Sequence, residues 1–270
     1  MFQVRSEAVR TFNEMSHCLD VIRAKSTIRM VVPRLMILGL SLFLTAGAHA
    51  AGPSFSCAKA QSAAEKAICG NPGLAALDVK IAEEFRTLHA ALDPQSAAAL
   101  AQDQRWFVGV RDRIAETPKN MSPPEMSVVL KDRAKFLGAI DAHPPEGFAG
   151  TWRNVAGGFD IKVRADGAFS IEGNAAQPVN GNWVCDYQGS GKATGSLLEP
   201  KTEEVDENSK LVASDANASR LSLTREGATL KVKTIVAPSD GANPFCGMNG
   251  FFDGAYFLVP AGYDKIPGSF

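Results

Sequence analysis

The sequence has few of the residues from which metal centres and hydrolytic sites are commonly built. It contains 4 histidines and 5 cysteines in 270 residues, and only His89 and His143 lie beyond position 50. Neither a C-x2-4-C pair nor a group of neighbouring histidines occurs, so no zinc site is expected. The patterns G-x-S-x-G and H-E-x-x-H are absent as well. We therefore expect no cofactor, no metal and no catalytic centre.

A phosphate-binding loop and a nucleic-acid surface are also disfavoured. The stretch 189–194, GSGKAT, lacks the leading Gly of a phosphate loop, and Ala193 follows Lys192 where Ser or Thr is needed. Residues 1–50 carry three acidic and six basic side chains, so without them the formal net charge moves from −1 to about −4. A chain of this charge has no strong basic footprint for nucleic acid.

Long apolar runs are scarce, and the one at residues 35–46, LMILGLSLFLTA, is too short to span a bilayer. Arg29 and Arg34 precede it and Ala48-His49-Ala50 follows it, which is the pattern of a secretory signal peptide. We expect cleavage after Ala50, a periplasmic or secreted product, and no membrane span in the mature form. Either Met1 or Met30 could be the initiator methionine.

Export changes the interpretation of the cysteines, because an oxidising compartment favours disulfides over free thiols. Four cysteines lie beyond residue 50, and four cysteines allow three pairings. We expect Cys57–Cys69 and Cys185–Cys246, since each pair then lies within one compositional half of the chain.

The first half, residues 51–142, has the periodicity of helices. Ser62 and Glu65 form a capping-box pattern that predicts a helix from Ala63, and Gly70 predicts its end after Cys69. Apolar residues at spacings of three and four predict the next helices over 72–92, 95–116 and 123–141. The stretch 143–147, HPPEG, is expected to be a stiff linker.

Two ionic residues lie on or beside the apolar faces of these predicted helices. Asp78 follows the apolar stripe of the second helix, and Arg111 lies two turns after Gln104 on the third. Burying either charge alone is costly, so we expect a mutual bidentate pair. Asp78, Gln104 and Arg111 are therefore predicted to form a structural polar link between the two helices.

The second half, residues 148–262, consists of short alternating runs such as FDIKVR, RLSLT and TLKVKTIV, separated by turn residues. Hairpin turns are predicted at 165–167 and 225–227. The fold class is thus α+β in two domains: an N-terminal disulfide-stapled helical bundle and a C-terminal antiparallel β-barrel or sandwich, with residues 263–270 as a tail.

The second half also carries an acidic run. Its members are Glu199, Glu203, Glu204, Asp206 and Glu207. Three interpretations stay open: a solvated hairpin loop, an acidic surface facing a basic partner, and a calcium loop, although the ligand spacing and central Gly of the last are missing.

The order F-x-C-x-K-A, E-K-A-I-C, L-x-x-L-D and Q-R-x-aromatic-x-x-x-R-D resembles the N-terminal domain of the LprI-type lysozyme inhibitors. The matching positions are Phe55, Cys57, Lys59, Ala60, Glu65, Lys66, Ala67, Ile68, Cys69, Leu74, Leu77, Asp78, Gln104, Arg105, Phe107, Arg111 and Asp112. The resemblance implies a secreted all-helical module, lysozyme inhibition and a basic lysozyme-type protein as partner. Gly150-Thr151-Trp152 resembles the opening of lipocalin-like barrels.

We therefore expect an exported, non-catalytic binding protein of the bacterial envelope that inhibits a lysozyme-type glycosidase. Two alternatives stay open. One is a periplasmic carrier that holds a small ligand in the interior of the β domain. The other is an envelope hydrolase, which requires two or three polar residues that converge in a cleft.

Overall fold

The computed structural model describes residues 52–116, 122–205, 211–213 and 218–264. The predicted signal peptide and its cleavage site lie outside these ranges. Among the described residues, no helix is both long and apolar enough to cross a bilayer.

The helices lie close to where the capping signals place them. They are η1 (Cys57–Lys59), α1 (Ala63–Gly70), α2 (Pro72–Ala91), α3 (Pro94–Glu116) and α4 (Pro123–Ala139). The capping box at the start of α1 is confirmed, because Ser62 Oγ accepts from the Glu65 N–H and Glu65 Oε2 accepts from the Ser62 N–H, both over 3.1 Å. Asn71 caps α2 in the same way by accepting from two backbone N–H groups.

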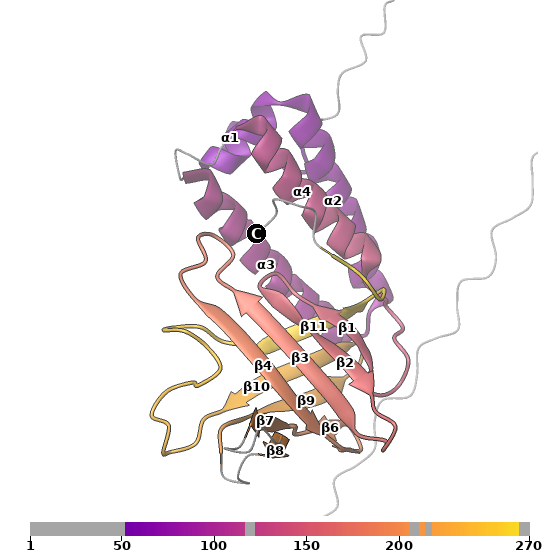
Figure 1. The fold of residues 1–270 in the computed structure, drawn as a ribbon. Coiled ribbons are helices and arrows are strands. Elements are labelled where there is room, and N and C mark those ends of the chain that lie inside the picture. The colour runs from indigo at the N-terminus through magenta and orange to yellow at the C-terminus, as the bar shows by residue number, and fades with distance from the viewer. Residues whose placement is uncertain (1–51, 117–121, 206–210, 214–217, 265–270) are drawn as a thin grey trace, which may run out of the picture. The chain divides into compact units, whose positions relative to one another are not determined.

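The strands form one antiparallel sheet that curls into a half-barrel (Figure 1). They are β1 (Gly150–Arg153), β2 (Gly157–Val163), β3 (Phe169–Ala176), β4 (Val184–Gly191), β5 (Ala193–Thr194), β6 (Leu197–Leu198), β7 (Lys201–Val205), β8 (Leu211–Ala213), β9 (Arg220–Glu226), β10 (Thr229–Ile235) and β11 (Gly254–Val259). Their order is β5-β6-β9-β10-β11-β1-β2-β3-β4-β7-β8. The fold is therefore α+β with an antiparallel β half, as predicted, and its sheet curls into a half-barrel.

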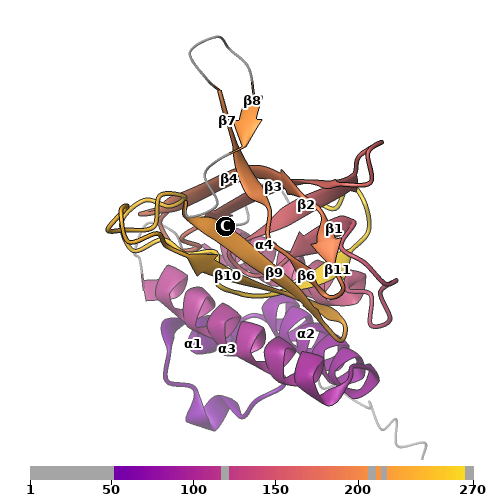
Figure 2. The same cartoon turned by 90° about the horizontal axis from the view of Figure 1, so that it is seen from below.

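Residues 201–205, which include Glu203 and Glu204 of the acidic run, form a strand. This strand, β7, pairs first with β4 through Lys201 and Thr202 and then with β8 through residues 203–205. Figure 2 shows this hairpin projecting from the sheet. Part of the acidic run therefore lies on a strand of a hairpin, and residues 206–210 between the two strands lie outside the described residues.

Both predicted hairpin turns are confirmed, and one of them meets a helix. Gly167 and Gly227 lie in the β2–β3 and β9–β10 turns with φ of 76° and 56°. A Cβ on Gly227 would lie 2.3 Å from Asp93 Oδ2, at the start of α3. The N–H of Ala228 donates to Ser96 Oγ over 2.9 Å in the same place. This turn therefore joins the sheet to α3.

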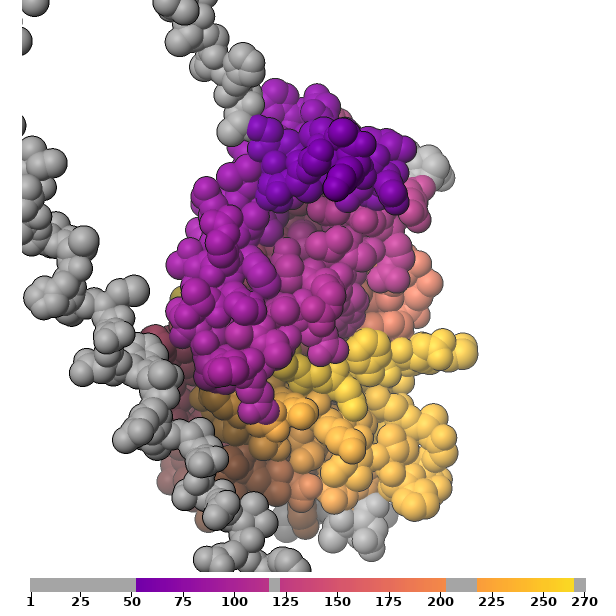
Figure 3. Space-filling model, turned by 180° about the vertical axis from the view of Figure 1, so that it is seen from behind, coloured from indigo at the N-terminus to yellow at the C-terminus, as the bar shows by residue number. Residues whose placement is uncertain are grey.

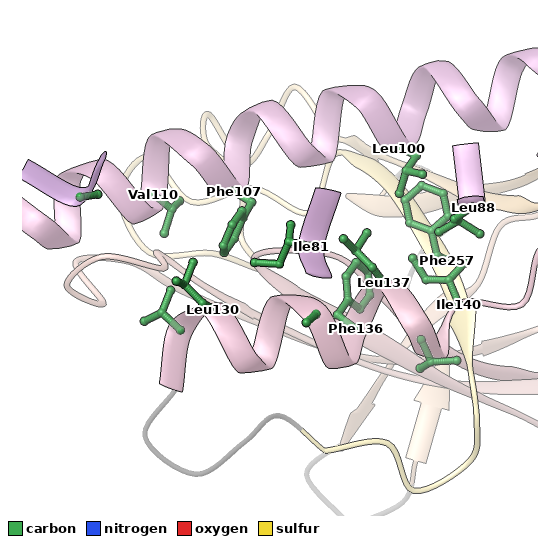
Figure 4. Packing of buried hydrophobic residues seen from close by; sticks show 14 of the residues in the cluster. Ile81, Leu88, Leu100, Phe107, Val110, Leu130, Phe136, Leu137, Ile140 and Phe257 are labelled. Carbon is green, nitrogen blue, oxygen red and sulfur yellow. The ribbon is translucent and has the colours of Figure 1, made fainter. Parts of the chain in front are cut away.

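The helices and the sheet also share apolar contacts. The core between the helices includes Phe257 and Val259 of β11, and Figure 4 shows Phe257 among the side chains of the helices. Phe257 meets the ring of Phe136 on α4 edge to face, with centroids 6.5 Å apart. The described residues from 52 to 264 belong to one compact unit.

A second core fills the concave face of the β half. Its largest fully buried side chains include Trp152, Phe159, Tyr187, Phe252 and Tyr256. Trp152 is 1 % exposed and donates from Nε1 to the carbonyl of Phe148 over 2.8 Å. The Trp of the G-T-W motif is thus part of the packed core.

Both predicted disulfides are confirmed. Cys57 is bonded to Cys69 across α1, and Cys185 of β4 is bonded to Cys246 in the segment between β10 and β11.

Candidate functional site

The predicted pair of Asp78 and Arg111 lies between α2 and α3, but it is not bidentate. Arg111 Nη1 is 4.0 Å from Asp78 Oδ1, and both side chains are under 10 % exposed. Nε and Nη2 of Arg111 instead donate to Asp112 Oδ1 over 2.9 and 2.7 Å. Asp78 Oδ2 accepts from the Ser54 N–H over 2.7 Å. The predicted bidentate geometry was wrong because each group has a nearer partner: Asp112 for Arg111, and the Ser54 N–H for Asp78.

Gln104 does not join this pair, which corrects a second part of the prediction. Its Oε1 accepts from Arg133 Nε of α4 over 2.9 Å. The helical spacing from Arg111 was correct, but that spacing does not identify a partner on another helix.

A cavity of about 230 Å³ lies beside Asp78 and Arg111. Its wall includes six of the positions that carry the LprI resemblance. They are Phe55, Glu65, Asp78, Gln104, Phe107 and Arg111. Six of the 17 matching positions thus gather at one place in the fold.

The charged side chains that line this cavity form hydrogen bonds or ion pairs with neighbouring residues. The pKa of Glu65 lies below its usual value, first because its carboxylate accepts from the backbone N–H groups of Gln61 and Ser62, and to a smaller extent because Arg111 is near. Since Arg111 and Asp78 have partners too, this arrangement favours a structural role over proton transfer.

A buried ion pair between α3 and α4 was not predicted from the sequence. Arg133 Nη1 donates to Asp103 Oδ2 over 2.6 Å, and their side chains are 2 % and 6 % exposed. One signal for Arg133 was available, because it lies four residues after Val129 and three before Phe136, on the apolar face of the helix. The identity of its partner depends on which helices face each other.

The acidic run does not form one surface loop. Glu199 forms an ion pair with Arg220 at 3.6 Å. Glu203 and Glu204 belong to β7. Asp206 and Glu207 lie outside the described residues.

A more distinct surface feature is the segment 236–253 between β10 and β11, which we call the disulfide loop. Figure 3 shows the gold and yellow segments of this region standing out from the surface. Within this loop, the side chain of Met248 is 86 % exposed and that of Phe251 is 40 % exposed. Val184, beside the disulfide on β4, is 62 % exposed. Several large apolar side chains therefore face solvent in one region.

The disulfide loop is held firmly despite this exposure. Besides the Cys185–Cys246 bond, the Gly247 N–H donates to the Val184 carbonyl over 2.8 Å, and the Asp186 N–H donates to the Phe245 carbonyl over 2.9 Å. Phe251 contacts two tryptophans: its ring centroid lies 5.3 Å from that of Trp183 and 5.7 Å from that of Trp106 on α3. These restraints fix the conformation of the loop before any partner binds.

The disulfide loop and the strand to which it is bonded carry acidic but no basic side chains. Residues 177–191 and 236–259 contain Asp186, Asp240 and Asp253 but no Lys, Arg or His, and all three aspartates are exposed. Asp253 is fixed by the Thr234 N–H over 2.8 Å, and Asp240 accepts from Ser219 Oγ. The arrangement fits a surface that binds a basic protein through apolar and acidic side chains together.

Comparison of the chain with protein-family models, with curated proteins and with solved structures finds no match. The resemblance to the LprI-type inhibitors therefore remains a hypothesis that rests on the motif residues.

Proposed function

We propose that this protein is an exported, non-catalytic binding protein of the bacterial envelope that inhibits a basic, lysozyme-type glycosidase, with the disulfide loop as its contact surface. The observation that carries the proposal is Met248, an apolar side chain that is 86 % exposed in a loop fixed by a disulfide. Methionine adapts its shape to a partner at low cost, and a fixed loop loses little conformational entropy on binding. The resemblance of the helical half to the LprI-type inhibitors names the class of partner.

Charge supports the same partner. A lysozyme of high isoelectric point is attracted to the net charge of about −4 that remains without residues 1–50. Asp240 and Asp253 belong to the disulfide loop that carries Met248, and the N–H of Asp186 donates to the Phe245 carbonyl of that loop. Such attraction acts mainly on the rate of association and weakens with salt.

The experiment is a cell-wall clearing assay with a basic c-type lysozyme and the oxidised protein of residues 51–270. We expect saturable inhibition that weakens as the salt concentration rises. Met248→Lys should abolish it, because the change removes the apolar contact and adds a positive charge. Val163→Lys is the matched control, since Val163 is 61 % exposed on β2 and lies outside the loop. Full lysozyme activity in excess wild-type protein would contradict the proposal.

The alternative of a carrier that holds a small ligand inside the β half has less support. That alternative requires a closed barrel with a lined cavity. Among the described residues, Trp152, Tyr187 and Tyr256 fill the concave face of the sheet. Among the described residues, no feature favours the hydrolase over a binding protein.

The division into two domains belongs to the same proposal. It places a helical module at 51–142, a linker at 143–147 and a β module at 148–262. Because Phe257 and Val259 complete the helical core, we expect residues 51–142 alone to be helical but less stable than in the full chain. Circular dichroism during urea unfolding of both proteins tests this, and an unfolded fragment would contradict the two-domain organisation.

A further inference from the structure

Arg133 has a buried donor with no partner among the described residues. Its Nη1 and Nε donate to Asp103 and Gln104, as described above. Its Nη2 is buried and meets no acceptor in the part of the chain that the structure describes. A buried guanidinium N–H without an acceptor lowers stability, so buried donors of this kind are normally satisfied by protein, water or ligand.

A second unsatisfied donor lies in the wall of the same cavity. The hydroxyl of Tyr263 is buried and has no hydrogen-bond partner among the described residues. Burial raises the pKa of Tyr263, so its hydroxyl keeps its proton and remains a donor at neutral pH. Arg133 and Tyr263 both line a cavity of about 50 Å³ between α3, α4 and the turn after β1.

The rest of this cavity is mainly apolar. Phe107, Val110, Ile114, Val129, Phe136 and Pro178 contribute to its wall. Two buried donors in an apolar enclosure are typical of a pocket that orients a small, largely apolar ligand through one polar atom.

The charges of the cavity favour an uncharged ligand. Arg133 is already paired with Asp103, and Arg153 is paired with Asp160 at 2.9 Å. Asp132 also lines the cavity. Lys135 Nζ lies 4.9 Å from the ring centroid of Tyr263, but it donates to the Asp264 carbonyl and is not part of the cavity wall. A carboxylate ligand would therefore meet no unbalanced positive charge in the wall, and it would lose its hydration on entry.

We propose that this cavity binds a small uncharged molecule with an apolar body and one carbonyl or hydroxyl oxygen, which accepts hydrogen bonds from Arg133 Nη2 and Tyr263 Oη. The volume suits a ligand of a few heavy atoms, since a single water needs about 10–15 Å³ on the same scale. The site is separate from the disulfide loop, so it does not depend on the proposed inhibition.

The experiment is a titration of methyl-labelled residues 51–270 with butanone, followed by NMR. We expect saturable shifts of the methyl signals of Ile114, Val110 and Val129. Tyr263→Phe should weaken binding roughly threefold to tenfold, the effect of one lost hydrogen bond. Tyr187→Phe is the matched control, because its hydroxyl lies in the other core and donates to the Pro200 carbonyl, and it should leave the affinity unchanged.

Butanoate distinguishes the charge of the ligand, and we expect it to bind at least tenfold more weakly than butanone at pH 7. Three results would overturn the proposal: no saturable shift with butanone, which would mean that the cavity holds only water; equal or tighter binding of butanoate; or equal affinity of Tyr263→Phe and the wild type. Arg133 is not substituted, because its loss would leave Asp103 buried without a counter-charge.

Discussion

Asp103 on α3 and Arg133 on α4 form a buried ion pair whose carboxylate also reaches the sheet. Oδ2 of Asp103 accepts from Arg133, and Oδ1 accepts from the N–H of Val155, after β1, over 3.1 Å. The guanidinium carbon lies 5.0 Å from the ring centroid of Phe107 and 5.1 Å from that of Phe136. One carboxylate thus connects two helices and the β half.

Asp103→Ala is therefore expected to lower the free energy of unfolding strongly, by roughly 3–5 kcal/mol, because it leaves the Arg133 charge buried and unpaired. The measurement is urea unfolding of oxidised protein. Lys231→Ala is the control, since Lys231 is 59 % exposed and pairs with Glu226 at 3.6 Å, and exposed pairs contribute about 1 kcal/mol or less. Similar losses for the two variants would contradict the connecting role of Asp103.

The two disulfides are expected to stabilise the chain unequally. They close loops of 12 and 61 residues, which corresponds to about 3 and about 4 kcal/mol in the chain-entropy model. Double Ser variants of each pair, compared by urea unfolding, measure the two contributions. If the Cys57–Cys69 variant loses clearly more than the Cys185–Cys246 variant, contacts rather than loop closure determine the effect. The second variant also shows whether inhibition needs a fixed disulfide loop.

Arg111→Ala is expected to destabilise more than Asp78→Asn. The first change leaves the Asp78 carboxylate buried at 9 % exposure without its nearest cation, a loss on the order of 3 kcal/mol. The second keeps an acceptor for the Ser54 N–H and leaves Arg111 with Asp112, so about 1 kcal/mol is expected. Thermal unfolding measured together with lysozyme inhibition tests the structural assignment. Unchanged melting with lost inhibition would make Arg111 a contact residue instead.

The helix ends could be predicted from the sequence because their signals are local. The side chains of Ser62 and Asn71 accept from backbone N–H groups within three residues, and the Glu125 carboxylate accepts from the Ser122 N–H. The pattern and the structure thus involve the same short segment. The partners of Asp78, Gln104 and Arg111 could not be predicted in this way. Ion pairing depends on competition with groups that are adjacent only in the fold, such as Arg133 for Gln104.

The solvent exposure of individual side chains in the disulfide loop was equally difficult to predict. The run 245–252, FCGMNGFF, has the composition of a core segment, and Phe252 is fully buried. Met248 and Phe251 face solvent because the disulfide and the turn around Gly247 fix the direction of the chain. Composition alone does not distinguish these neighbours, so the candidate surface could be found only from the structure.

Asp93 should make stability fall in acid. Its pKa lies below the usual value, first because Ser96 donates to it from its hydroxyl and its backbone N–H, with Ala228 contributing less. A lowered folded pKa means that the contribution is complete above about pH 4 and is lost as the pH falls through the folded value. The stability gap between wild type and Asp93→Asn should thus be constant from pH 7 to 5 and shrink below pH 4. A gap that widens in acid would contradict the contact with Ser96.

Tyr263→Phe should leave the free energy of unfolding almost unchanged, whereas Tyr187→Phe should lower it by about 1 kcal/mol. The two tyrosines are both buried, but Tyr187 Oη donates to the Pro200 carbonyl over 3.0 Å, while Tyr263 Oη has no partner among the described residues. Removing the Tyr187 hydroxyl leaves the buried Pro200 carbonyl without this donor. Removing the Tyr263 hydroxyl deletes a group that lost its hydration on folding and formed no hydrogen bond with the described residues. Urea unfolding without ligand gives the comparison.

The same measurement in saturating butanone tests the ligand-bound state. Butanone should raise the free energy of unfolding of the wild type and of Tyr187→Phe more than that of Tyr263→Phe, because only the bound state uses the Tyr263 hydroxyl. A marked loss for Tyr263→Phe without ligand would show that the hydroxyl already has an acceptor within the chain.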